Sequence, residues 1–144
     1  MQKYFKKELF FTDVEGKTKD EVLKNLCRKV EQEKGLPETF TASVLKREEL
    51  TPTDYGNLVA LPHPERAFQE RAFVAVAVLK EPIFWFRQKV QVVFLTAIGR
   101  EEDENLQQFY EATTDLILRP ADVQNLIRHP DYDRLIQLLR RAEE

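Results

Sequence analysis

The spacing of apolar residues changes along the chain, and the first regular stretch has the spacing of a helix. In this stretch an aliphatic residue recurs every fourth position, at Val22, Leu26 and Val30. Residues this far apart lie on one face of a helix. Thr18 opens the stretch with a capping-box pattern, and Gly35 closes it. We therefore predict a helix over residues 19–34.

A second helical face follows Pro37, a residue type that suits the first turn of a helix. Its apolar positions are Phe40, Val44 and Leu45. A helix with this face carries Arg47 and Glu48 in or just after its last turn. The polar, proline-containing segment that comes next breaks the pattern, so we expect the helix to end there.

The middle of the chain contains apolar runs that predict strands. Residues 73–79 and 90–98 are apolar almost throughout, which is typical of strands covered on both faces. The shorter run 58–61 lies between turn residues and predicts a short buried strand. Glu81-Pro82 predicts a turn, and residues 83–86 predict an aromatic piece at the edge of a sheet.

Helical spacing returns in the last third of the chain. It begins at Leu106 after an acidic segment and ends before Pro120, and residues 121–128 and 132–141 form two further amphipathic patterns. Strands and helices therefore alternate. This order predicts an α/β fold in which a mixed central β-sheet is flanked by helices on both faces.

The chain is expected to form a single domain over residues 17–144. Residues 1–16 are charged and aromatic without a clear period, and they are open to interpretation as a lead-in strand or a linker remnant. With 42% hydrophobic and 33% charged residues among 144, the composition is that of an ordinary globular protein.

Charge and cysteine content exclude several classes of function. The net charge of -3 gives no electrostatic basis for direct nucleic-acid contact. We see neither an apolar run of about 18 residues nor an export signal, so we expect no membrane insertion and a cytoplasmic location. Cys27 is the only cysteine and cannot form an internal disulfide. The sequence shows no metal-ligand spacing, and we expect no metal or cofactor.

One histidine stands at the end of a predicted strand and between two prolines. Pro62 offers no N–H to a sheet, so strand pairing should stop there, and Pro64 favours an extended backbone at His63. Gly56 allows a tight turn into the strand. The imidazole is therefore predicted to be held at a rigid position.

The sequence GNLVALPHP, preceded by LKREELTPTDY, resembles the active-site signature of the IIA proteins of the bacterial phosphoenolpyruvate-dependent sugar phosphotransferase system, fructose/mannitol type. That pattern combines Arg-Glu, a Ser/Thr-rich turn, a glycine and an apolar strand that ends in Pro-His. The positions that match it are Arg47, Glu48, Thr51, Thr53, Gly56, Ala60, Leu61, Pro62 and His63. The order of elements from about residue 18 to residue 139 also fits this family.

The resemblance implies a phosphoryl-transfer site. His63 would be the phosphorylated nucleophile, with the phosphocarrier protein HPr as donor and the cysteine of a IIB domain as the usual acceptor. A neutral imidazole is a good nucleophile near pH 7. Arg47 would clamp the phosphoryl oxygens, because a guanidinium binds them in bidentate fashion. Thr53 and nearby backbone amides could add donors, and Glu48 would support the site.

One departure from the family pattern bears on function. Transport members carry a second histidine where this chain has Asn105, and an asparagine cannot carry a proton. The Pro-His-Pro sequence resembles IIA-like modules in transcriptional antiterminators and activators of the BglG/LicR group. We therefore favour a regulatory module attached to the rest of a multidomain regulator. A sugar-transport IIA component and a non-phosphorylated binding module are the alternatives, and His129 is interpreted as structural.

Overall fold

The strands form one mixed sheet in the computed structural model, which describes residues 2–143. They are β1 (Phe5–Phe11), β2 (Asp54–Gly56), β3 (Val59–Ala60), β4 (Phe73–Phe84) and β5 (Lys89–Ala97). Their order across the sheet is β1-β4-β5-β3-β2. β1 runs parallel to β4 and β3 runs parallel to β5, while the β4–β5 and β2–β3 pairs are antiparallel. The predicted mixed sheet is confirmed.

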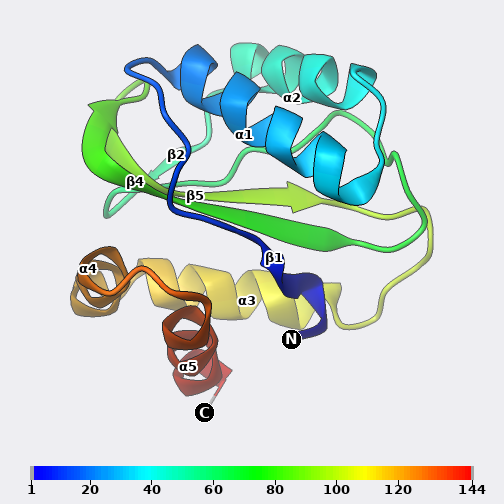
Figure 1. Ribbon diagram of the computed structural model, residues 1–144. Helices are drawn as coiled ribbons and strands as arrows, with labels where there is room; N and C mark the ends of the chain where they lie inside the picture. The colour runs from blue at the N-terminus through cyan, green and yellow to red at the C-terminus, as the bar shows by residue number, and fades with distance from the viewer. Residues whose placement is uncertain (1, 144) are drawn as a thin grey trace.

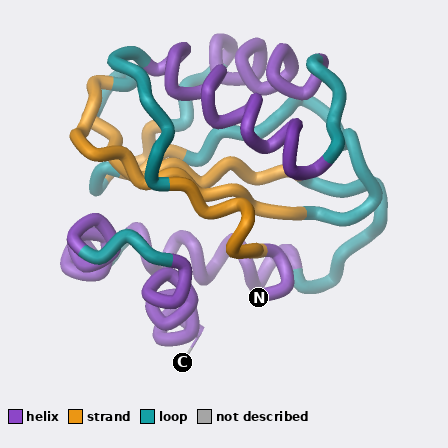
Figure 2. Tube along the Cα trace, viewed as in Figure 1, coloured by secondary structure: helices purple, strands orange, loops and turns teal. Residues whose placement is uncertain are grey.

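Helices cover both faces of this sheet (Figure 1). One face carries α1 (Lys19–Lys34) and α2 (Thr39–Leu50). The opposite face carries α3 (Leu106–Ile117), α4 (Pro120–Arg128) and α5 (Tyr132–Glu143), and a short 3-10 helix η1 (Gln2–Tyr4) precedes β1. Figure 2 shows the strands as a layer between these two groups of helices. The α/β architecture expected from the sequence is therefore the observed one.

The unbroken apolar runs of β4 and β5 are explained by two cores, one on each face of the sheet. Along β4, Ala75 and Ala77 face the core under α1 and α2, whereas Val74, Val76 and Val78 face the core under α3 to α5. Successive side chains of a strand point to opposite faces, so a strand that is covered on both needs apolar residues at every position.

α1 begins and ends where its caps predict. The Thr18 hydroxyl oxygen accepts a hydrogen bond from the backbone N–H of Glu21 at 3.2 Å. At the other end Gly35 takes a left-handed conformation with φ 65°, which a glycine adopts without steric cost. Cys27 is fully buried in this helix, and burial raises the pKa of its thiol.

The predicted turn at Glu81-Pro82 is wrong, because β4 continues through these residues to its end at Phe84. The register between β4 and β5 shifts between Val78 and Ile83. Pro82 has no N–H for a regular ladder, and an irregularity at this point accommodates it without ending the strand. The chain reverses later, where the N–H of Trp85 donates to the carbonyl of Gln88 at 2.9 Å.

The segment that the sequence left open between a strand and a linker remnant contains β1. This strand lies at one edge of the sheet beside β4. Phe5 and Leu9 are each 2% exposed and belong to the two cores on opposite faces of the sheet. Within residues 2–143, no helix is long and apolar enough to cross a bilayer.

Candidate functional site

His63 lies just beyond β3, at one end of the sheet. The residue before it is tied to β5, because the carbonyl of Pro62 accepts hydrogen bonds from Thr96, at 3.0 Å from its backbone N–H and 3.4 Å from its hydroxyl. β3 itself is only two residues long but pairs with β5 on one side and β2 on the other. The backbone next to His63 is therefore fixed by bonds to β5 that continue to Pro62, where we expected strand pairing to stop. The side chain of His63 is partly exposed.

The orientation of the imidazole follows from one hydrogen bond. Its Nδ1 atom lies 3.0 Å from the carbonyl oxygen of Pro64. A carbonyl oxygen can only accept, so Nδ1 carries the proton in this arrangement and Nε2 carries the lone pair. Nε2 is therefore the ring nitrogen of His63 with a lone pair available for a chemical step.

Two hollows meet at His63. The first, which we call the arginine hollow, has a volume of about 360 Å³ and includes Arg47, Arg66 and Ile98 in its lining. The second, which we call the hydroxyl hollow, has a volume of about 430 Å³ and lies between the sheet and α3. Besides His63 it is lined by apolar residues, by the acidic residue Asp54 and by the hydroxyl-bearing residues Thr53, Tyr55, Thr96, Tyr110, Thr113 and Thr114.

Arg47 comes from the last turn of α2, as the sequence predicts, and lines the arginine hollow with His63. Its Nη1 atom donates to the carbonyl of Thr51 at 2.9 Å. This bond uses one of the five N–H donors of the guanidinium and orients the rest of the group. The structure thus places a permanent positive charge in the wall of the hollow that His63 also lines.

Arg66 is a second guanidinium in the arginine hollow, and sequence reasoning missed it. Its central carbon lies 3.9 Å from the centroid of the Phe68 ring, a cation–π contact that restrains an otherwise exposed side chain. In the sequence it belongs to a polar segment after His63 that looks like any solvated loop. Its position three residues after His63 was the only available signal.

Glu48 and Thr53 are bonded to each other. Glu48 is 1% exposed, and its carboxylate accepts from the backbone N–H of Thr53 at 2.6 Å and from the Thr53 hydroxyl at 2.8 Å. Both donors of Thr53 are engaged in this way, although we expected them to face a phosphate. Thr53 therefore contributes to the site as a wall of the hydroxyl hollow and as part of a fixed loop.

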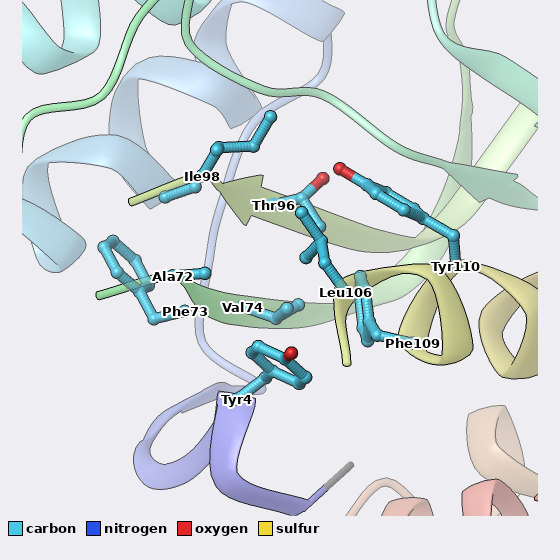
Figure 3. A pocket seen from close by; sticks show the side chains of 10 residues that line it. Tyr4, Ala72, Phe73, Val74, Thr96, Ile98, Leu106, Phe109 and Tyr110 are labelled. Atoms are coloured by element: carbon cyan, nitrogen blue, oxygen red, sulfur yellow. The ribbon is translucent and has the colours of Figure 1, made fainter. Parts of the chain in front are cut away.

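Residues of α3 form one side of the hydroxyl hollow. Tyr110 is 38% exposed, and partial burial raises its pKa, so its hydroxyl stays protonated at neutral pH and can donate a hydrogen bond. Figure 3 shows the hydroxyls of Tyr110 and Thr96 turned toward each other, one from the helix and the other from β5. The helical pattern of the sequence reveals only the buried face of α3, so it gave no sign of this polar edge.

Asn105 does not join this group. It is exposed at the start of α3, where its backbone N–H donates to Asp103 at 3.0 Å. Asn105 lines a different hollow, together with Lys3 and Arg71. His129 is exposed at the end of α4 and also lies outside both hollows. Within residues 2–143, no cluster of three or more His, Cys, Asp or Glu side chains could hold a metal ion.

Two of the relatives in sequence are transcription regulators, and a third, the Multiphosphoryl transfer protein 1 of Escherichia coli (strain K12), is 24% identical over 136 residues, which are 92% of this chain and 16% of that protein. The chain is 37% identical over 133 residues to the Probable licABCH operon regulator of Bacillus subtilis (strain 168), and 27% identical over 120 residues to the Transcriptional regulator ManR of the same organism. These matches cover 92% and 83% of this chain but only 21% and 18% of the regulators. The chain therefore spans about a fifth of the length of these relatives.

Solved structures share the fold. The complex of enzyme IIAMTL and phosphorylated enzyme IIBMTL from Escherichia coli contains a chain that superposes with a TM-score of 0.74 at 17% identity, over 91% of this chain and 94% of that one. The family profile described as "Phosphoenolpyruvate-dependent sugar phosphotransferase system, EIIA 2" matches residues 3–142. The chain belongs to this EIIA 2 family of the sugar phosphotransferase system.

Proposed function

We propose that this domain accepts a phosphoryl group from HPr on Nε2 of His63 and serves as the regulatory module of a sugar-responsive transcription regulator or antiterminator. The observation that carries the proposal is the bond from Nδ1 of His63 to the carbonyl of Pro64, which leaves the lone pair on Nε2 of a ring that shares a hollow with Arg47. A cytoplasmic location is part of the proposal, because the donor protein has to reach the site.

The chemistry is an in-line transfer between two nitrogens. The lone pair of Nε2 forms a bond to phosphorus while the bond from phosphorus to the donor's histidine nitrogen breaks, and the donor ring keeps that electron pair. Nδ1 keeps its proton, and the Pro64 carbonyl stabilises the positive charge that develops on the ring. Arg47 and Arg66 stabilise the equatorial oxygens, which carry most of the negative charge of the transition state.

Two observations favour different fates for the phosphoryl group. The matched regulators, at 37% and 27% identity, support a regulatory role, in which roughly two negative charges on His63 change how the domain contacts the rest of its protein. The fold shared with the IIAMTL chain of the complex supports the alternative of a transport component that passes the group to a IIB domain. A module of the same fold that is not phosphorylated is the third possibility.

A transfer assay separates these functions. The domain is incubated with ³²P-labelled phospho-HPr, and a IIB domain is then added in excess. We expect rapid labelling of the domain and slow passage to IIB, because Asn105 supplies no second imidazole and lies outside both hollows at His63. Rapid passage would establish the transport alternative, and an unlabelled domain would leave only the binding module.

Arg66 gives a second test of the phosphoryl site. We expect Arg66→Ala to slow labelling by about tenfold, since an exposed guanidinium that contacts the transferring group contributes less than a buried one. Arg71→Ala is the matched control, because Arg71 is an exposed arginine of the same segment that lines neither hollow at His63. Equal labelling rates in the two variants would remove Arg66 from the site.

A further inference from the structure

Glu48 is a buried carboxylate without a counter-ion. It is 1% exposed, and none of the ion pairs found among residues 2–143 includes it. A buried charge is costly unless hydrogen bonds satisfy it. The hydrogen-bond donors around Glu48 therefore matter for stability, and they identify the segments that its carboxylate connects.

The donors come from two separate parts of the chain. Trp85 lies in the turn between β4 and β5, is 4% exposed, and its indole N–H donates to Glu48 Oε2 at 2.9 Å. The other two donors are the backbone N–H and the hydroxyl of Thr53, in the loop after α2. The carboxylate therefore joins α2, the following loop and the β4–β5 turn at one point.

The loop after α2 and the last turn of α2, which the Glu48 carboxylate joins, are each connected to a residue of the proposed phosphoryl site. The carbonyl of Thr53 accepts from the backbone N–H of Leu61 at 3.0 Å, two residues before His63. On the other side Arg47 directly precedes Glu48, and its guanidinium is bonded to the Thr51 carbonyl in the same loop. A movement of the Glu48 carboxylate would therefore displace the clamp and the nucleophile relative to each other.

A second carboxylate, on the first residue of β2, binds the same turn. Asp54 Oδ2 accepts from the backbone N–H groups of Arg87 at 2.5 Å and Gln88 at 2.8 Å. The turn is thus bonded to Glu48 through Trp85 and to Asp54 through Arg87 and Gln88. Of these bonds, only the one from Trp85 involves Glu48, the residue next to Arg47. This arrangement separates the role of the indole N–H from the general anchoring of the turn.

We propose that Trp85 is a positioning residue for phosphoryl transfer. Its indole N–H orients the Glu48 carboxylate, which holds the Thr53 loop and through it the geometry of Arg47 and His63. The inference rests on the proposed function, because it concerns the rate of the same reaction. Of phenylalanine, tyrosine and tryptophan, only tryptophan has a ring N–H, so a change to phenylalanine removes the bond while much of the buried ring is kept.

The test compares Trp85→Phe with Phe86→Leu, which changes a half-exposed aromatic residue of the same turn. Single-turnover labelling by phospho-HPr is measured over a range of HPr concentrations. We expect Trp85→Phe to lower the maximal labelling rate about tenfold, since misplaced reacting groups slow the chemical step. The HPr concentration that gives half of the maximal rate should change less than twofold. Phe86→Leu should match the wild type. An unchanged rate in a labelled and folded Trp85→Phe would overturn the inference.

Thr53→Val provides the second arm. It removes the hydroxyl bond to Glu48 and keeps the backbone one, so the double variant with Trp85→Phe should be slower than the wild type by less than the product of the single effects. If the double variant were slowed by the full product of the two single effects, the positioning role would be refuted. The same holds if each variant lost labelling rate only in proportion to its folded fraction, measured by urea denaturation. A wild type that takes no label removes the proposed function and this inference together.

Discussion

His63→Gln is expected to take no phosphoryl label from HPr. Glutamine keeps a polar side chain of similar reach but has no nitrogen lone pair that can attack phosphorus. We expect the fold to remain, because the imidazole is partly exposed and makes one side-chain hydrogen bond, to the neighbouring Pro64 carbonyl, worth about 1 kcal/mol. His129→Gln is the matched control and should be labelled like the wild type.

The measurement for this pair is ³²P incorporation, with circular dichroism and urea denaturation to show that both variants are folded. Label that survives in a folded His63→Gln would remove His63 from its role. Loss of label in His129→Gln would move the site to the end of α4, away from both hollows.

Arg47→Ala is expected to slow labelling by about 10²- to 10³-fold, the effect of removing one well-placed donor from a transition-state charge site. Arg47→Lys should recover only part of this loss, because an ammonium keeps the charge but cannot bind two oxygens in a planar fork. Lys46→Ala, at an exposed neighbouring position of α2, is the control. Rapid-quench measurement of the labelling rate would contradict the clamp role if Arg47→Ala were slowed less than threefold.

Local sequence patterns predicted the helices and strands that are determined by residues within or next to them. α1 is specified by its Thr18 and Gly35 caps, and the strands by apolar runs that the two cores require. The end of β4 was mispredicted because Glu81-Pro82 ordinarily marks a turn. What prolongs the strand is the pairing of residues 83–84 with β5, beyond the register shift. That contact is set by tertiary structure and leaves no local signature.

The same distinction applies to the site. His63 and Arg47 were found because one continuous motif contains both, whereas Tyr110 reaches the site from α3, 47 positions later in the chain than His63. In the aromatic piece predicted over residues 83–86, Trp85 is buried whereas Phe84 and Phe86 are exposed. The bond from the Trp85 indole N–H to Glu48 spans 37 positions, so no spacing in the sequence could indicate it.

The proposed function depends most directly on which nitrogen of which histidine carries the phosphoryl group. Two-dimensional ¹H–¹⁵N NMR of the imidazole rings, recorded on the domain after reaction with phospho-HPr, distinguishes the two ring nitrogens of His63 and those of His129. We predict phosphorus on Nε2 of His63, with the proton retained on Nδ1 by the Pro64 carbonyl. Phosphorylation on Nδ1 of His63, or on His129, would contradict the geometry on which the proposed function is built.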